Sequence, residues 1–171
     1  MITFSKLFKQ VTHTMHMMSG VVLISMMFIT LTDVFTRTMF KLTDGTFDFT
    51  FIGGIELTKY GLLFVVLFSL PYSVGRSQVI VDLFTDNLSG RIKVILEGIF
   101  MLGFVALGGG MCSRFYHAAV QSQMTGETTQ DLLIPLYYLY GLSAFATGML
   151  AVAAMLISLR CFFYWKGDKV S

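Results

Sequence analysis

GGIELTKYGLLFVVLFSLPYSVGRSQVIVD, at residues 53–82, is the stretch that decides the fold. Its centre, residues 60–74, contains no charged side chain and is mostly Leu, Val, Phe and Gly. Glu56 and Arg76 stand 20 positions apart at its two ends, and this separation is about 30 Å along a helix, one hydrocarbon thickness. The stretch predicts a membrane-spanning helix with a charge at each face. Pro71 predicts a kink or weak turn in it.

The composition indicates a small integral membrane protein. The chain has 171 residues, of which 55% are hydrophobic and 13% charged, with 17 Phe and 12 Met. Its net charge of +2 comes without a basic block, so nothing favours nucleic acid as a partner. Cys112 and Cys161 have no metal-ligand spacing, and no metal site is predicted.

Apolar runs predict an all-α fold with four transmembrane helices in a single domain that covers residues 1–171. The spans are expected at about 15–37, 53–75, 92–114 and 134–160. Short amphipathic interfacial helices are expected at about 78–89, where Asp82 and Asp86 alternate with apolar residues, and at 2–12.

The basic residues predict the orientation. With the N-terminus inside, the cytoplasmic side holds eight basic residues: Lys6, Lys9, Arg76, Arg91, Lys93, Arg160, Lys166 and Lys169. The outer side holds four: Arg37, Lys41, Lys59 and Arg114. The positive-inside rule therefore places both termini in the cytoplasm. Cys112 and Cys161 then lie near opposite membrane faces and cannot form a disulfide.

Two interpretations are open for the charges at the outer ends of the first two spans. Asp33 precedes Arg37 by four positions, which is the favourable order for an ion pair along one helix face. Alternatively, Arg37 reaches Glu56 and clamps spans one and two together. In either case a charge near the bilayer needs a partner.

Small residues predict where spans three and four meet. Gly103, Ala106 and Gly110 lie on span three, and Ala144 and Gly148 lie on span four. Ala106 with Gly110, and Ala144 with Gly148, have the small-xxx-small spacing that lets helices approach closely. We expect these faces to be in contact.

Glu97 has three possible roles. It lies about one turn inside span three, where it can snorkel towards water, pair with Lys93 four positions earlier, or act as a coupling carboxylate.

The deep residues of the spans provide no obvious polar pathway, and no hydrolase, metalloprotease, phosphate-loop or dinucleotide motif is present. A transporter that acts alone normally has polar groups near the midplane. The chain is therefore expected to be a non-enzymatic accessory or scaffold subunit. The alternatives are a membrane anchor of a haem or quinone redox complex, which would need a further iron ligand because its histidines lie apart, and a stand-alone small multidrug exporter that depends on Glu97.

Four motifs in order carry a family resemblance: DVxxRxxF at 33–40, GIELxKY at 54–60, YSVGRSQVIVD at 72–82 and TxxLLIPLYYLY at 129–140. Together they resemble the small membrane subunit, DctQ type, of the tripartite ATP-independent periplasmic (TRAP) transporters. The resemblance implies sodium-driven uptake of an organic acid, such as a C4-dicarboxylate or a sialic acid, across the bacterial inner membrane.

The resemblance also implies partners. A large membrane subunit would hold the substrate and sodium sites, so this subunit needs no cofactor, and a periplasmic solute-binding protein would deliver the substrate. The outer segment with Gln121, Glu127 and Asp131 would contact the binding protein. Arg76 and Asp82 would fix the inner turn, and apolar faces of the spans would cover the large subunit.

Overall fold

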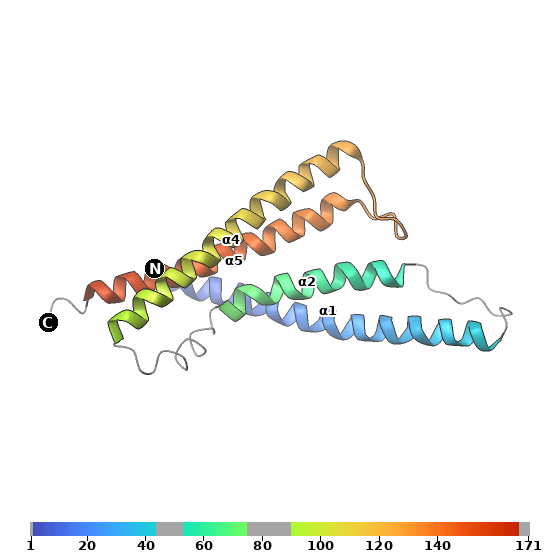
Figure 1. Ribbon diagram of the computed structural model, residues 1–171, viewed down its shortest axis with the longest axis horizontal. Helices are drawn as coiled ribbons and strands as arrows, with labels where there is room; N and C mark the ends of the chain where they lie inside the picture. Colours follow the sequence, from blue (N-terminus) through green and yellow to red (C-terminus); the bar gives the residue numbers. More distant parts are fainter. Residues whose placement is uncertain (1, 44–52, 75–89, 168–171) are drawn as a thin grey trace.

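The computed structural model describes residues 2–43, 53–74 and 90–167, which form four helices (Figure 1). Their bounds are α1 Ile2–Leu42, α2 Gly54–Val74, α4 Gly90–Thr125 and α5 Leu136–Gly167. Each helix contains a stretch long and apolar enough to cross a membrane: Phe8–Leu42, Gly54–Val74, Leu96–Thr125 and Leu136–Leu159. The predicted all-helical fold with four spans is confirmed for this part of the chain.

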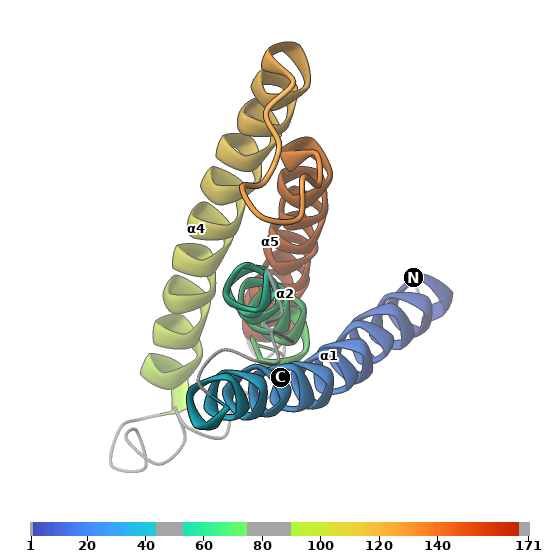
Figure 2. The same cartoon turned by 90° about the vertical axis from the view of Figure 1, so that its right-hand side faces the viewer.

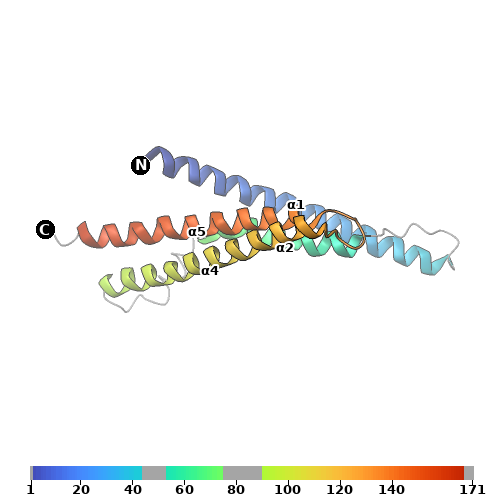
Figure 3. The ribbon, with the colours of Figure 1, turned by 90° about the horizontal axis from the view of Figure 1, so that it is seen from above.

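Successive helices run antiparallel, and both ends of the chain lie at the same end of the molecule (Figure 3). α1 packs on α2, α4 packs on α5, and α2 also contacts α5. Seen along the bundle, α2 lies between α1 and α5, and α4 is on the far side of α5 from α1 (Figure 2). The fold is therefore two helical hairpins joined through α2 and α5. The assignment of the termini to the cytoplasm stays a prediction.

α5 supplies most of the contact surface because its inner face is built from small side chains. Buried residues recur at three- and four-residue spacing, which places them on one side of the helix: Ser143, Ala146, Thr147, Leu150, Ala153, Ala154 and Ser158. Ala146 packs with Met15, Leu67 and Phe68, whereas Leu150 and Ala154 pack with Val74 and Met101. Small side chains let two neighbouring helices approach the same helix closely.

Two hydroxyls in this face, on Ser143 and Thr147, are satisfied within α5. Ser143 Oγ donates a hydrogen bond to the Leu139 carbonyl at 2.8 Å. Thr147 Oγ1 donates to the Ser143 carbonyl at 2.9 Å. Each hydroxyl is therefore buried without leaving an unpaired donor, which would be costly in an apolar medium.

α4 approaches α5 closely at Gly108. A Cβ atom added at Gly108 would lie 3.0 Å from the backbone nitrogen of Ala151. Gly103, Ala106 and Gly110 are exposed instead, so the predicted contact through these three residues is wrong. Glycines at 108–110 offer small residues on several sides of α4, and spacing alone does not identify the side that packs.

The predicted face of α5 does turn inward. Ala144 is buried, and a Cβ atom at Gly148 would lie 3.3 Å from Cys112 Sγ on α4. The predicted face of α4 therefore does not contact the predicted face of α5. Ala144 and Gly148 of α5 nevertheless face the interior of the bundle.

α1, α4 and α5 extend beyond the spans predicted from the sequence, α5 to Gly167, whereas α2 agrees closely with its predicted span of about 53–75. α1 is continuous from Ile2, so the segment 2–12 is the first part of α1 and not a separate interfacial helix. α2 continues unbroken through Pro71 to Val74. α4 continues to Thr125, so the segment expected to be a loop from Gln121 is helical over its first residues. The predicted interfacial helix at 78–89 lies outside the described residues.

Candidate functional site

The loop of residues 126–135, between α4 and α5, is closed by its own hydrogen bonds. Gly126 has a φ of 68°, and its N–H donates to the Ser122 carbonyl at 3.0 Å, which ends α4 with the left-handed residue that glycine tolerates best. Thr129 N–H donates to the Ile134 carbonyl at 2.9 Å, and Leu136 N–H donates to the Glu127 carbonyl at 3.0 Å.

Thr129 is the buried centre of this loop. Its Oγ1 accepts a hydrogen bond from the Ile134 N–H at 3.0 Å. Because the backbone and the side chain of Thr129 both bond to Ile134, the two sides of the loop are tied together at this residue.

The Glu56 carboxylate on α2 holds the same loop from outside. Oε1 accepts the Gln130 N–H at 3.1 Å, and Oε2 accepts the Asp131 and Leu132 N–H groups, both at 2.9 Å. Hydrogen bonds to an ionised acceptor are stronger than neutral ones. We call this arrangement, the Glu56 carboxylate with the amides of residues 130–132, the Glu56 latch. It joins the first helical hairpin to the loop of the second.

Gly53 makes the latch possible by letting the loop approach the start of α2. Its φ is 102°, a conformation that glycine adopts at no steric cost. Its carbonyl accepts the Leu57 N–H at 2.9 Å. A Cβ atom at this position would lie 3.0 Å from the Leu132 side chain, so a larger residue would push the loop away from Glu56.

Arg37 forms the local pair and not the clamp. Its Nε lies 3.0 Å from Asp33 Oδ2, whereas the Glu56 oxygens are occupied by three backbone amides. The Arg37–Glu56 contact is therefore not formed in the structure. The reason is geometric, since an acid four positions earlier lies on the same helix face.

Leu133 is the most unusual residue of the loop. Its φ is 52°, and its side chain is 70% exposed. A non-glycine residue in this region loses roughly 1–2 kcal/mol through the contact of Cβ with the backbone. The hydrogen bonds of the loop hold Leu133 in this state, so a large apolar side chain is presented to the outside. Strained residues of this kind cluster at functional sites, and the sequence carries no signal for this one.

The residues predicted to contact a binding protein all lie at this end of the molecule. Gln121 is exposed on α4, and Glu127 and Asp131 are exposed on the loop beside Leu133. Arg76 and Asp82 lie outside the described residues, so their predicted roles stay predictions.

Glu97 remains open between its three interpretations. Its side chain is half-buried, and its Oε1 is buried without a hydrogen-bond partner among the described residues. The side chain of Lys93 lies outside the described part of the structure.

The histidines lie at two ends of the bundle. The His13 and His16 rings lie against Tyr72 at the last turn of α2, and His117 lies beside Tyr116 in the last third of α4. Among the side chains that the structure describes, at 8–43, 53–74 and 96–159, no three of His, Cys, Asp or Glu are grouped as metal ligands would be.

A family model described as tripartite ATP-independent periplasmic transporters, DctQ component, matches residues 26–163. The matched range begins inside α1, contains all of α2 and α4, and ends inside α5. It therefore includes Glu56, the loop of residues 126–135 and every contact of the latch. Comparison with curated proteins and with solved structures gives no match.

Proposed function

Because the chain belongs to the DctQ family, the small membrane component of TRAP transporters, we propose that it is the scaffold subunit of a sodium-driven importer of an organic acid. In this proposal it acts in the bacterial inner membrane with a large membrane subunit and a periplasmic solute-binding protein. The family match over residues 26–163 is the observation that carries the proposal.

The interior of the bundle supports a scaffold role. Within the described residues, every fully buried polar side chain is Ser or Thr. Four of these hydroxyls, on Thr12, Ser19, Ser143 and Thr147, donate to a carbonyl of their own helix. Substrate and ion pathways in membrane proteins are usually marked by ionisable groups facing the bundle interior. The organic acid and the sodium ions would therefore cross through the large subunit.

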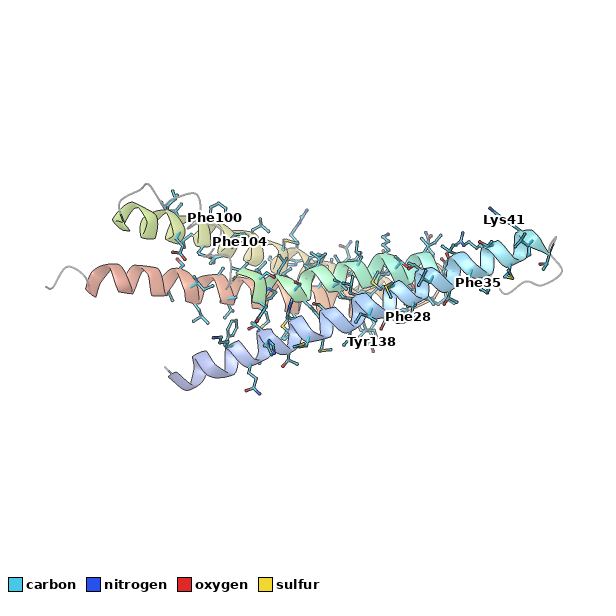
Figure 4. The ribbon with its side chains drawn as sticks, turned by 90° about the horizontal axis from the view of Figure 1, so that it is seen from below. Phe28, Phe35, Lys41, Phe100, Phe104 and Tyr138 are labelled. Carbon is cyan, nitrogen blue, oxygen red and sulfur yellow. The ribbon has the colours of Figure 1, made fainter. Side chains whose placement is uncertain are left out.

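The outer face of the middle of α1, residues 17–35, is the surface we assign to the large subunit. Apolar side chains are exposed along most of this helix, and Phe28 and Phe35 project from it (Figure 4). Among the four described helices, only α2 packs extensively against α1. This face would otherwise be covered by lipid, and a polytopic partner would bury it by close packing of side chains.

The loop of residues 126–135 is the surface we assign to the solute-binding protein. It is held rigid from inside by Thr129 and from outside by the Glu56 latch. Leu133 offers an apolar anchor, and Glu127 and Asp131 are exposed on the same loop. An apolar centre with a charged rim is the usual anatomy of a protein interface. The complementary surface would carry an apolar socket with a basic rim.

Uptake in proteoliposomes tests this assignment. The subunit is reconstituted with the large subunit encoded beside it, and the binding protein is titrated in the presence of a sodium gradient. Leu133→Asn removes the apolar anchor and is expected to weaken binding by about 1–2 kcal/mol, which raises the half-maximal concentration of binding protein roughly 5–30-fold. Charge reversal at Glu127 and Asp131 is expected to shift it in the same direction.

Leu42→Asn is the matched control, because Leu42 is 71% exposed at the same end of the bundle, on α1. We expect Leu42→Asn to leave the half-maximal concentration unchanged. An unshifted titration for Leu133→Asn, or an equal shift for both variants, would remove the loop from the binding-protein interface.

A further inference from the structure

A hollow lies between the early part of α1 and the last turn of α2, at the end of the bundle that carries the chain termini. Its volume is about 300 Å³, and it is lined by Lys9, Gln10, His13 and Tyr72. The hollow is far from the Glu56 latch, at the opposite end of α2. Nothing in the proposed transport function uses these residues.

All four lining side chains can donate hydrogen bonds, and none is acidic. Lys9 contributes an ammonium group, Gln10 an amide, His13 an imidazole and Tyr72 a phenol. Lys9, Gln10 and His13 lie within five residues of α1, and Tyr72 comes from α2. An ammonium group with neighbouring N–H and O–H donors can bind the oxygens of a phosphate group.

Aromatic contacts hold the wall of the hollow in place. The Tyr72 ring lies 4.6 Å from the His16 ring with an interplanar angle of 18°, and 5.6 Å from the His13 ring with an angle of 51°. The two imidazoles are one helical turn apart on α1, so Tyr72 is fixed against that helix by both. The His13 and Tyr72 rings are therefore positioned before a ligand arrives, which reduces the entropy lost on binding.

The hollow lies at the level expected for the lipid headgroups. The uncharged stretch of α2 ends at Val74, two residues before Arg76, and the first span is expected to begin at about residue 15, two residues after His13. Tyr side chains are enriched at the boundary between hydrocarbon and headgroups. Lys9 lies at this boundary, where a lysine can extend its ammonium group to the phosphate layer.

We propose that this hollow binds the phosphate of an anionic phospholipid such as phosphatidylglycerol. Basic pockets between transmembrane helices are a known mode of headgroup recognition. The positive charge of Lys9, with no acidic side chain among the described lining residues, favours an anionic headgroup over a zwitterionic one. The proposal uses no partner protein, so it stands or falls separately from the transport function.

Native mass spectrometry of the full-length chain tests the site. The chain is solubilised in detergent and titrated with phosphatidylglycerol or with phosphatidylcholine of the same acyl chains. The double variant Lys9→Gln with His13→Gln is expected to retain less phosphatidylglycerol relative to phosphatidylcholine than the wild type does. We expect the ratio to fall at least roughly fivefold, because the loss of about one basic charge near an anionic surface has an effect of this size. Lys9→Arg with His13→Lys keeps the donors and is expected to retain the preference.

Lys41→Gln with His117→Gln is the matched control, since Lys41 is exposed at the opposite end of α1 (Figure 4) and His117 is exposed on α4. This pair is expected to keep the lipid preference. Equal retention by the wild type and by Lys9→Gln with His13→Gln would overturn the site. If inorganic phosphate raises the melting temperature of the chain as much as phosphatidylglycerol does, the occupant of the hollow is not a lipid.

Discussion

Replacing Gly108 by alanine tests how closely α4 and α5 approach each other, and Gly109 supplies the matched control. A Cβ atom at Gly108 would lie 3.0 Å from the nitrogen and 3.2 Å from the Cα of Ala151, whereas nothing lies within 4 Å of one at Gly109. Both variants gain about 0.8–1.0 kcal/mol of helix propensity. At Gly108 alone, the contact is with backbone atoms that cannot rotate away, and overpacking costs about 1–3 kcal/mol.

We therefore expect Gly109→Ala to be neutral or stabilising by up to about 1 kcal/mol. Gly108→Ala is expected to be less stable than Gly109→Ala by roughly 1–3 kcal/mol. Unfolding of the isolated subunit in mixed detergent and dodecyl sulfate micelles, followed by circular dichroism, measures the difference.

The thiol of Cys112 provides a second readout, in a Cys161→Ser background. Its Sγ lies against Gly148, so we expect faster alkylation of Cys112 when Gly108→Ala separates the helices. Equal stabilities for the two variants, together with unchanged alkylation, would refute the close approach at Gly108.

Three other predictions concern the charged and hydroxyl groups at the loop end. Arg37→Ala removes a pair in which the arginine is 48% exposed, and we expect a loss of only about 0.3–0.5 kcal/mol in chemical unfolding. Thr129→Val leaves the Ile134 N–H without its side-chain acceptor. The lost hydrogen bond stabilises the loop by roughly 1–3 kcal/mol, so faster amide exchange is expected at Ile134. Glu56→Gln removes the charge and one acceptor oxygen, so faster exchange is expected at residues 130–132 and little change at Ile134. Uniform exchange across the loop in both variants would contradict these separate roles.

The four spans could be predicted because hydrocarbon thickness imposes a long apolar run on each of them. The stretch from Tyr60 to Val74 carries this signal without interruption, and α2 occupies it to its last residue. The lengths of α1 and α4 could not be predicted as well, because a helix continues past the bilayer without needing apolar residues there.

The partner of Glu56 could not be predicted from residue types. The sequence correctly indicated that a charge at the end of α2 needs a partner, but the partners are the backbone amides of residues 130–132. Backbone amides occur at nearly every position and leave no pattern in the sequence. Arg37 could be considered as a partner because the charge of a side chain, unlike a backbone amide, can be recognised from the residue type.

The side of α4 that packs was also hidden. Gly108, Gly109 and Gly110 are adjacent, and the spacing rule applies to several combinations of small residues along this helix. Only the position of Ala151 on the neighbouring helix identifies Gly108 as the contact. Leu133 is a similar case, because its positive φ follows from the closure of the loop and not from its own preference.

Copurification followed by reconstituted uptake is the most direct test of the role as a transporter subunit. The chain is tagged and expressed with its flanking genes, and the proteins that remain bound are identified by mass. We expect a stoichiometric large polytopic partner, and uptake of an organic acid in vesicles that requires both a solute-binding protein and sodium. A chain that purifies alone, or uptake that proceeds equally without this subunit, would contradict the proposed function.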